Sequence, residues 1–247
     1  MMIKQLINRI RFPHTYSSGA YVAYLRKLGM EIGDDVTIYS PRGSIIDKQY
    51  PWMIKIGNHV RISTGVTILT HDFSWSVLKN YSGNNDNAGG AVFGASGKVT
   101  IGDNVFIGMH SIILRGAKIG NDVIIGAGSI VTGECEDGWV YAGNPARKMI
   151  RVEEYYRKRE VAQLEEAVIL VQEYYRCFHK APPQEVLFEY FMLFADPDHL
   201  AEKYEKQLQL GGTKEKSIQY MRTSKRMFSD FDTFIAYCLS ETMKKRE

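Results

Sequence analysis

Residues 99–131 read VTIGDNVFIGMHSIILRGAKIGNDVIIGAGSIV, and in this stretch an aliphatic residue recurs at every sixth position. The recurring residues are Ile101, Ile107, Ile113, Ile119, Ile125 and Val131. A period of six matches neither an amphipathic helix nor a strand with one buried face. It is typical of a parallel β-solenoid, in which each hexad supplies one short strand and one corner. The sequence therefore predicts a mainly β fold, a prism with stacked aliphatic residues inside.

The same period extends, with an interruption, over residues 32–68. Ile38 and Ile56 are eighteen residues apart, which equals three hexads and one full turn of a three-sided coil. This spacing predicts that the two residues lie one coil apart. Aliphatic residues are missing around Ser44 and Tyr50, which indicates that the first turn is distorted or partly looped.

The register fails once inside the repeat region. Ile68 and Ile101 are thirty-three residues apart, a distance that six does not divide, and the polar, glycine-rich run NYSGNNDNAGG lies between them. We expect the chain to leave the prism over about residues 71–98 and then to return. Loops longer than about a dozen residues are commonly functional, so this loop is a candidate site.

The regions on either side of the prism have a different character. Residues 1–30 are expected to form a short helical or irregular cap ahead of the prism, which spans residues 31–151. From Val152 the apolar period becomes helical, so residues 152–247 are expected to form an α-helical C-terminal domain with an aromatic core. Helices are expected from Val152 to the Pro182–Pro183 pair and then within residues 182–194, 196–208 and 229–245.

Composition places the chain among ordinary folded proteins. Of its 247 residues 45% are hydrophobic and 24% are charged, and the formal net charge is only +3. A charge this small does not indicate a nucleic-acid-binding surface, so no nucleic-acid partner is expected. Cys135, Cys177 and Cys238 are widely spaced and form no metal-ligand pattern, which indicates reduced thiols and a cytoplasmic location.

The first eighteen residues, MMIKQLINRIRFPHTYSS, mix basic and apolar side chains. They contain no continuous hydrophobic segment, so neither a signal peptide nor a transmembrane segment is expected. An amphipathic N-terminus can still lie on a membrane, which leaves peripheral membrane contact open.

Two further segments accompany the hexads. GVTILTHDFSWSVLK, residues 65–79, leads into the loop, and AGNPARKMIR, residues 142–151, closes the repeat region. Together with the repeats they resemble the hexapeptide-repeat acyltransferases with a left-handed β-helix, over roughly residues 30–151. The resemblance is greatest to the maltose/galactoside and xenobiotic acetyltransferases and to O-acetyltransferases encoded with bacterial capsule or lipopolysaccharide genes.

The resemblance implies a homotrimer that binds acetyl-CoA in the cleft between neighbouring prisms. It also implies direct transfer of the acetyl group to a hydroxyl of the acceptor, here a sugar or glycan. A thioester is already activated, so the chemistry needs a base that removes the hydroxyl proton. Neutral histidine can act as this base at cytosolic pH, while a backbone N–H stabilises the oxyanion.

Two histidines are candidates for the base, and the sequence does not separate them. His110, in IGMHSIILRG, occupies a position that resembles that of the catalytic histidine in galactoside-type enzymes. His71, in TILTHDFSW, opens the loop, where xenobiotic-type enzymes place a histidine that reaches a neighbouring subunit. A trimer could bring both to one cleft. Gly65 stands where galactoside-type enzymes have a substrate-contacting asparagine, which puts a galactoside or maltose acceptor in doubt.

Residues beside His71 are further candidates. Asp72 can accept an N–H from a histidine and fix its tautomer, which makes it a candidate catalytic residue; a turn-forming role explains it equally well. Trp75 and Phe73 can form a platform for the face of a sugar, which makes them candidates for substrate binding. Aromatic packing at the base of the loop is the alternative.

Coenzyme A requires a narrow groove for its pantetheine and cations for its phosphates. The small residues Gly126, Ala127 and Gly128 would let the pantetheine approach the backbone. The resemblance places the nucleotide phosphates near the end of the prism, where the candidates are Arg147, Lys148 and Arg151. Asn144 and Pro145, in the closing segment, are further candidates for binding the coenzyme. The alternative to coenzyme binding is that the glycines only form corners of the prism and that the charged residues are exposed to solvent beside a helix.

Two other functions compete with acyl transfer. A non-catalytic trimeric scaffold could use the helical tail to bind a partner. A γ-carbonic-anhydrase-like metal site would need a close pair of histidines after the loop, but Arg115 stands five residues past His110, where the second would be required. His59 and His71 are two hexads apart and could share a corner. We expect no metal cofactor, and the acceptor, the acyl group and the role of the tail stay open.

Overall fold

The structure is a computed structural model that describes residues 2–82, 89–224 and 226–244. It divides into two compact units, residues 1–155 and residues 156–247. Each unit has its own hydrophobic core, and the two are described separately.

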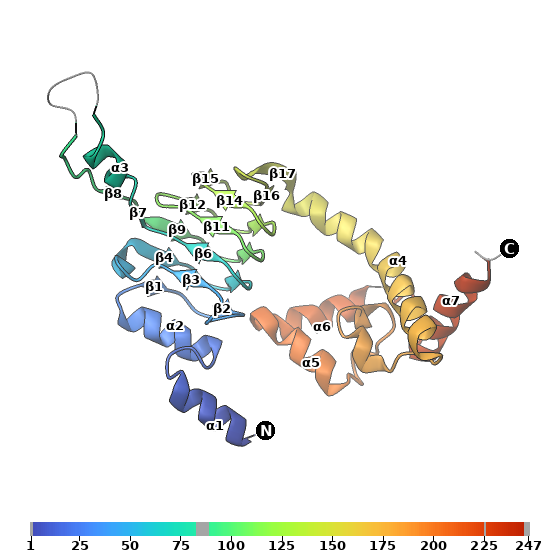
Figure 1. Ribbon diagram of the computed structural model, residues 1–247. Coiled ribbons are helices and arrows are strands. Elements are labelled where there is room, and N and C mark those ends of the chain that lie inside the picture. Colours follow the sequence, from blue (N-terminus) through green and yellow to red (C-terminus); the bar gives the residue numbers. More distant parts are fainter. Residues whose placement is uncertain (1, 83–88, 225, 245–247) are drawn as a thin grey trace. The chain divides into compact units, whose positions relative to one another are not determined.

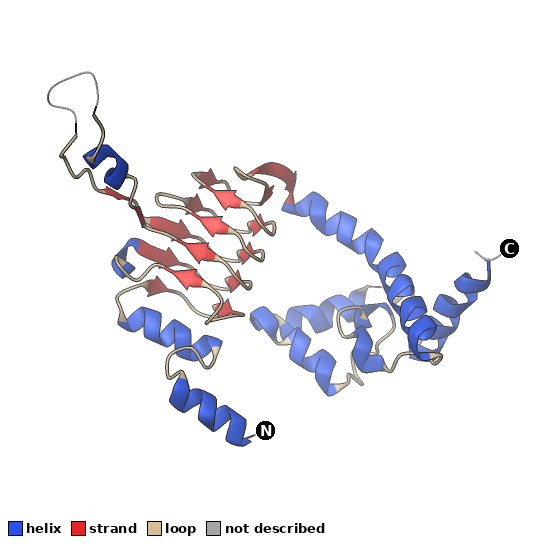
Figure 2. Cartoon of the chain, viewed as in Figure 1, coloured by secondary structure: helices blue, strands red, loops and turns tan. Residues whose placement is uncertain are grey.

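The first unit is built around three parallel sheets that the chain visits in turn, so that, apart from β7 and β8 in the loop, every third strand returns to the same sheet (Figures 1 and 2). The first sheet contains β1 (Glu31–Ile32), β4 (Ile54–Ile56), β9 (Val99–Ile101), β12 (Lys118–Ile119) and β15 (Glu134–Cys135). The second contains β2 (Thr37–Ile38), β5 (Arg61–Ile62), β10 (Phe106–Ile107), β13 (Ile124–Ile125), β16 (Trp139–Ala142) and the antiparallel β17 (Arg147–Arg151). The third contains β3 (Ile45–Ile46), β6 (Thr67–Ile68), β11 (Ile112–Ile113) and β14 (Ile130–Val131). The prediction of a left-handed parallel β-helix is confirmed.

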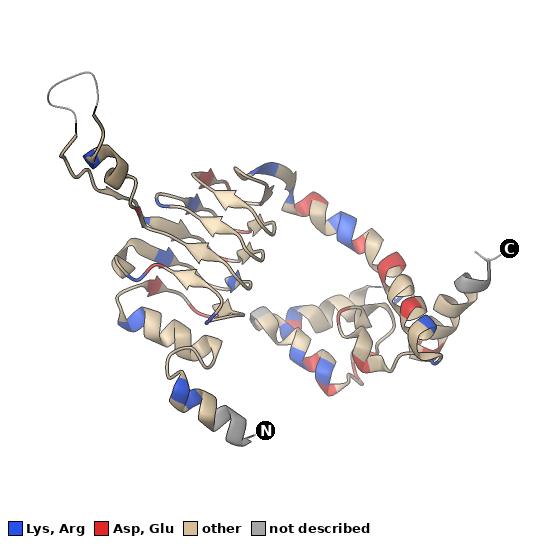
Figure 3. Ribbon diagram, viewed as in Figure 1, with Lys and Arg blue, Asp and Glu red and all other residues tan. Residues whose placement is uncertain are grey.

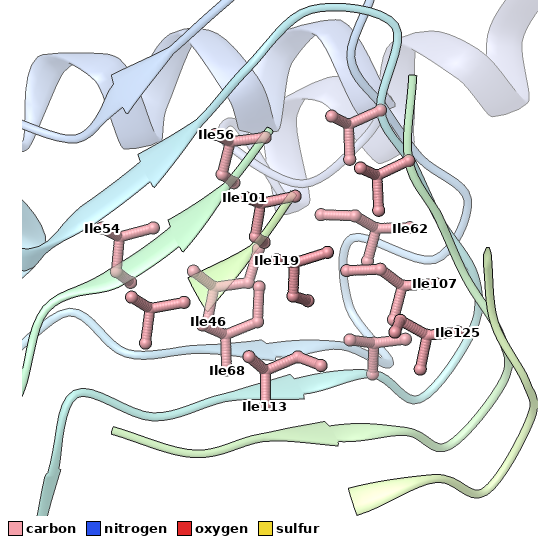
Figure 4. Packing of buried hydrophobic residues seen from close by; sticks show 14 of the residues in the cluster. Ile46, Ile54, Ile56, Ile62, Ile68, Ile101, Ile107, Ile113, Ile119 and Ile125 are labelled. Atoms are coloured by element: carbon pink, nitrogen blue, oxygen red, sulfur yellow. The ribbon is translucent and has the colours of Figure 1, made fainter. Parts of the chain in front are cut away.

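The hexad register determines which side chain enters the prism. Ile107 pairs with Ile125 eighteen residues later, and Ile113 pairs with Val131 over the same interval. These residues are almost completely buried, and Figure 4 shows the isoleucines stacked on one another inside the coils. Burial of each such side chain stabilises the fold by about 1.5–3 kcal/mol relative to exposure.

The first turn differs from the predicted spacing. Ile38 pairs with Ile62, twenty-four residues later, whereas Ile56 belongs to a different sheet and pairs with Ile32. The prediction that Ile38 and Ile56 lie one coil apart is therefore wrong. Two of the six additional residues fall between β2 and β3, and the other four fall in the corner between the third and first sheets, where the 3-10 helix η1 (Pro51–Met53) is inserted.

The chain leaves the prism after β6 and returns at β9. At its base the loop is closed by an antiparallel pair, β7 (His71–Asp72) and β8 (Ala95–Ser96), and the short helix α3 (Trp75–Lys79) follows β7. Residues 83–88 of the predicted loop lie outside the described residues. His71 is thus placed where the loop joins the rigid prism.

Two helices precede the prism, α1 (Met2–Arg11) and α2 (Ser18–Lys27). The Ser17 hydroxyl accepts a hydrogen bond from the Ala20 amide and so caps α2. Tyr21, Val22 and Leu25 of α2 are buried in the same core as the prism isoleucines. The Ile38 amide donates to the Ser18 hydroxyl, so α2 also satisfies a backbone group at the first coil.

The second unit is helical. Helix α4 (Val152–Phe178) joins the two units, and α5 (Glu202–Leu208), α6 (Lys214–Thr223) and α7 (Phe231–Lys244) follow, with 3-10 helices at η2 (Gln184–Leu187), η3 (Phe191–Leu193) and η4 (Leu210–Gly212). Instead of the helix expected within residues 182–194, the structure has only the two 3-10 turns η2 and η3, because the buried residues of this segment pack into the aromatic core. The sequence interpretation did not identify α6. Among the described helices, none is both long enough and apolar enough to cross a membrane.

Truncation of a stacked isoleucine should destabilise the prism strongly. We expect Ile107→Ala, at a fully buried position, to lower the free energy of unfolding by about 2–5 kcal/mol, because it removes packed methyl groups and leaves a cavity. All three tryptophans lie in the first unit, so tryptophan fluorescence during urea denaturation follows this unit. The matched control is Ile45→Ala, since Ile45 is also on a prism strand but is 62% exposed. Equal losses in the two variants would contradict the packing explanation.

Candidate active site

His71 lies at the corner between the third and first sheets, directly after β6. Its Nδ1 is 2.6 Å from Oδ2 of Asp47, which follows β3 at the same corner in the preceding coil. The Asp47 side chain is 4% exposed and that of His71 is 17% exposed. Residues twenty-four positions apart in the sequence therefore form a shielded histidine–carboxylate pair.

Three other hydrogen bonds hold Asp47. The amide of Thr70 donates to Oδ2 over 2.9 Å, the Thr70 hydroxyl donates to the same oxygen over 2.5 Å, and the Gln49 amide donates to Oδ1 over 2.9 Å. Burial on its own raises the pKa of Asp47, but these hydrogen bonds and the one to His71 outweigh it, and the net pKa is lowered. The carboxylate is therefore ionised and accepts the Nδ1 proton, which leaves Nε2 of His71 as the proton acceptor.

Asp72 has different partners from those expected. Its carboxylate accepts hydrogen bonds from the amide and hydroxyl of Ser74, over 3.0 and 2.5 Å, and from Nε of Arg115 over 2.5 Å. The Ser74 contacts and the Arg115 guanidinium lower the pKa of Asp72 to about 2. The expectation that Asp72 fixes the tautomer of a histidine is not met, because Asp47 binds His71. Asp72 instead shapes the turn after β7 and joins it to the prism.

Asp47 was missed by sequence reasoning. An acidic residue directly after a strand and one coil before a histidine is the signal that could have identified it. This signal was hidden because Ile46 and its partner Ile68 are twenty-two residues apart, four more than the regular eighteen, so the hexad spacing does not align Asp47 with the corner of His71.

Aromatic rings flank the His71 imidazole. The rings of Tyr50 and Phe73 each lie edge-on to the imidazole, and their centroids are 5.6 and 5.4 Å from the imidazole centroid. Trp75 is one ring further, 5.9 Å from Phe73, and is half-buried, whereas Phe73 is exposed. The structure thus brings together His71, Phe73 and Trp75 and adds Tyr50, which the sequence did not single out.

His110 occupies a different corner, between the second and third sheets. It is exposed and has a positive φ of 57°, and its amide donates to the Thr64 carbonyl over 2.9 Å. Gly65, in the corner one coil earlier, lies against the ring: a Cβ at Gly65 would be 2.2 Å from His110 Nδ1. Within the described residues, neither ring nitrogen of His110 has a hydrogen-bond partner. The absence of a side chain at position 65 is therefore what makes room for this imidazole.

The candidate residues for the coenzyme continue the same edge of the prism, which we call the His110 column and define as residues 64–65, 108–110, 126–128 and 143–145. The Gly128 amide donates to the Met109 carbonyl over 2.7 Å. Ala127 lies close against Gly108, and a Cβ added to Gly108 would be 2.5 Å from the Ala127 nitrogen. In the next coil the Gly143 carbonyl accepts from the Ile130 amide over 2.9 Å, ahead of Asn144 and Pro145. Backbone and small side chains therefore line an edge that includes His110.

The three cations at the end of the prism have different surroundings. Lys148 forms an ion pair with Glu136 at 2.6 Å and lies 4.9 Å above the Trp139 ring, and the Arg151 guanidinium is 4.3 Å from the same ring. These contacts hold β17 against β16. Arg147 is exposed and has no ion pair among the residues that the structure describes. Arg151 is likewise exposed and without an ion pair in that part of the chain, but it lies over the Trp139 ring, so Arg147 is the cation of the three that neither a carboxylate nor this ring holds.

The remaining candidates are separated by the fold. His59 lies at the third edge, between the first and second sheets, where its Nδ1 is 2.9 Å from Asp35; the expectation that His59 and His71 share a corner is therefore wrong. In the described parts of the chain, no three His, Cys, Asp or Glu side chains are grouped so that they could hold a metal ion. Burial raises the pKa of Cys135 to about 11, so its thiol is protonated at neutral pH and is a poor nucleophile.

Comparisons with known proteins show which families and proteins the chain resembles. The family model described as bacterial transferase hexapeptide (six repeats) matches residues 98–133. CapG of Staphylococcus aureus is 42% identical over 135 residues, which cover 54% of this chain and 73% of CapG. The galactoside O-acetyltransferase of Escherichia coli (strain K12) is 37% identical over 98 residues, which cover 39% of this chain and 43% of that enzyme. The crystal structure of a maltose O-acetyltransferase from Clostridium difficile 630 aligns with 54% of this chain and 75% of its own, at 25% identity and a TM-score of 0.38.

Substitution at Gly65 should displace the His110 ring. Gly65 has a φ of +75°, so Gly65→Ala is expected to lower the free energy of unfolding by about 1 kcal/mol from backbone strain alone. The matched control is Gly116→Ala, because Gly116 has a φ of +81° but no atom within 4 Å of an added Cβ. We expect both variants to be destabilised, and only Gly65→Ala to shift the imidazole NMR signals of His110. Unchanged signals in that variant would show that the contact is not present in solution.

Removal of the buried carboxylate should change the acid stability of the first unit. The lowered pKa of Asp47 lies below its unfolded value of about 3.9, so its contribution to stability is complete above that pH and is lost as the pH falls through the folded-state pKa. Asp47→Asn should therefore be less stable than the wild type at neutral pH, and the difference should narrow upon acidification. Urea denaturation followed by tryptophan fluorescence at a series of pH values measures this. A difference that stays constant at all pH values would contradict the role assigned to the ionised carboxylate.

Proposed function

Because the chain belongs to the bacterial hexapeptide-repeat transferases and is an acyltransferase, we propose that it transfers an acetyl group from acetyl-CoA to a hydroxyl of a sugar or glycan. The names of its relatives support acetyl transfer, since two of them are a galactoside and a maltose O-acetyltransferase. In this proposal the reaction takes place in the cytoplasm, where acetyl-CoA is produced. The acceptors are capsule-type glycans, as the similarity to CapG suggests.

The observation that carries the proposal is the pairing of His71 with Asp47. Nδ1 of His71 is bound to a shielded carboxylate at 2.6 Å, so the imidazole is held in one orientation with Nε2 as the basic nitrogen. His59 is also paired with a carboxylate, that of Asp35, but the His59–Asp35 pair is exposed to solvent, whereas the His71–Asp47 pair is shielded. A shielded pair suits a general base, because the carboxylate also stabilises the imidazolium that forms when the proton is taken up.

The chemical step follows from this geometry. Nε2 of the histidine takes the proton of the acceptor hydroxyl while the hydroxyl oxygen forms a bond to the thioester carbonyl carbon. The tetrahedral intermediate then expels the coenzyme A sulfur, which receives the proton from the imidazolium. Backbone N–H groups of the prism corners can stabilise the oxyanion. Direct attack of the hydroxyl on the thioester needs no covalent acyl-enzyme, and the buried, protonated Cys135 is poorly suited to form one.

The His110 column is the proposed binding site of the donor. Gly126, Ala127 and Gly128 leave the backbone accessible to the pantetheine, and the exposed Arg147 is available to the phosphates at the end of the column. Asn144 and Pro145 form the corner between these two parts. Lys148 and Arg151 act mainly by holding β17 in place through Trp139, and their charges add to the field around Arg147.

The two histidines belong to different edges of one prism, so a single site that uses both needs two chains. We therefore propose a homotrimer in which the His71 corner of one protomer faces the His110 column of its neighbour. In this arrangement the His71–Asp47 pair is the base, and His110 lies beside the donor carbonyl. Phe73 and Trp75 then form the wall against which the sugar ring packs, and Asp72 positions that wall through Arg115.

Loss of the base should lower kcat far more than it lowers donor binding. We expect His71→Ala to reduce kcat by about 10²–10⁴-fold, and Asp47→Asn to reduce it less, because it removes the positioning partner and leaves the imidazole in place. His110→Ala should also impair transfer in the proposed arrangement. Release of free thiol from acetyl-CoA, measured with and without candidate glycan acceptors, gives the rate. Full activity in His71→Ala would overturn the proposed base.

A mixing experiment tests the shared site. When His71→Ala and His110→Ala chains are produced together, mixed trimers contain interfaces in which both histidines are intact. We expect activity to reappear in the mixture above the level of either variant alone. The control is a mixture of His71→Ala with the double variant, which has no intact interface. If the first mixture stays as inactive as this control, both histidines act within one chain.

A further inference from the structure

The N-terminal region carries charge of one sign only. Residues 1–30 contain no Asp or Glu, and they contain five cations, Lys4, Arg9, Arg11, Arg26 and Lys27. In Figure 3 the coloured parts of the α1 and α2 ribbons carry the blue of Lys and Arg and none of the red of Asp and Glu. The net charge of the whole chain is only +3, so this region is far more basic than the average of the molecule.

Helix α1 combines this charge with exposed apolar side chains. Ile7 is 55% exposed and Ile10 is 74% exposed, and because they are three residues apart they lie on one face of the helix. Arg9 and Arg11 occupy the neighbouring positions in the last turn. A helix with apolar residues on one face and cations beside them is typical of segments that lie in a membrane interface.

A cationic pocket adjoins α1 within the first unit. It has a volume of about 570 Å³, and its lining includes Arg11 at the end of α1, His14, Arg42 and Lys48 but neither Asp nor Glu. Two of these cations lie close to the ring of Phe12, with the Arg42 guanidinium 4.4 Å and the Arg11 guanidinium 5.5 Å from its centroid. The pocket therefore holds two guanidinium groups on one aromatic ring, and mutual repulsion opposes this arrangement.

No carboxylate relieves that repulsion. Across the residues that the structure describes, Arg11, Arg42 and Lys48 have no salt-bridge partner, whereas many other cations of the chain are paired, for example Arg115 with Asp72. An oxyanion of a phosphate would accept hydrogen bonds from the guanidinium groups and neutralise them. The pocket thus has the chemistry of a phosphate site.

We propose that α1 and this pocket form a binding surface for an anionic phospholipid bilayer. Ile7 and Ile10 enter the boundary between headgroups and acyl chains, and the pocket binds a headgroup phosphate through Arg11, Arg42 and Lys48. A dissolved phosphate would use the pocket alone and would leave the two isoleucines in water. Arg11 belongs to both the helix and the pocket lining, which couples the apolar contact to the electrostatic one.

The test is sedimentation of the full-length protein with vesicles of phosphatidylcholine alone and with vesicles of an equimolar mixture of phosphatidylcholine and phosphatidylglycerol. We expect binding to the mixed vesicles only, weakening as salt is added, and a loss of affinity of about five-fold for each cation removed in Arg42→Ala and Lys48→Ala. Ile7→Ser with Ile10→Ser should also weaken binding. The matched controls are Lys118→Ala, an exposed lysine on β12, and Ile45→Ser, an exposed isoleucine on β3. Neither control should change binding.

Three results would overturn the proposal. One is binding that does not distinguish the two kinds of vesicle, or no binding to either. Another is binding of inorganic phosphate in the pocket, measured by calorimetry, without vesicle binding, which would indicate a soluble anion site. The third is a change of oligomeric state in the Ile7→Ser and Ile10→Ser variant with unchanged vesicle binding, which would show that α1 contacts a second copy of the chain. Thiol release from acetyl-CoA, measured separately, reports acetyl transfer independently of these results.

Discussion

Backbone hydrogen bonds between neighbouring coils hold every strand of the prism against the strand one turn away. The pairing of Ile107 with Ile62 below and Ile125 above is one example, and the inward isoleucines stack because this pairing keeps them in register. A coil cannot shift along its neighbour without turning apolar side chains toward water. The corners between strands are therefore fixed as firmly as the strands, and the candidate site consists of corners.

This rigidity explains how short polar segments can hold catalytic geometry. Asp47 is kept in place by amides and a hydroxyl from two coils, and it receives the His71 imidazole as one further donor. At another edge Gly65 leaves space that His110 fills. In both cases the adjacent coil supplies the surroundings of the histidine. The prism thus preorganises the side chains, and the loop after β7 adds the aromatic wall beside them.

Much of the fold was predictable because its signals are local. The hexad around Ile107, Ile113 and Ile119 needs no long-range information, since each repeat contacts only its neighbours. The helical tail was less predictable: residues 182–194 have the apolar content of a helix but form two 3-10 turns, because Phe191 and Leu193 pack into a core made by distant segments. Tertiary packing overrode local preference there.

For the candidate site, the sequence by itself determined the prism, the point where the register breaks, and the two histidines that these features single out. Only the tertiary structure decided which partners they have. Four extra residues lie in the coil between β3 and β6, so Asp47 reaches His71 across an interval that the regular repeat does not predict, while Asp72, the neighbour in sequence, turns toward Ser74 and Arg115. A regular repeat fixes local spacing, but contacts between coils depend on the length of every corner in between.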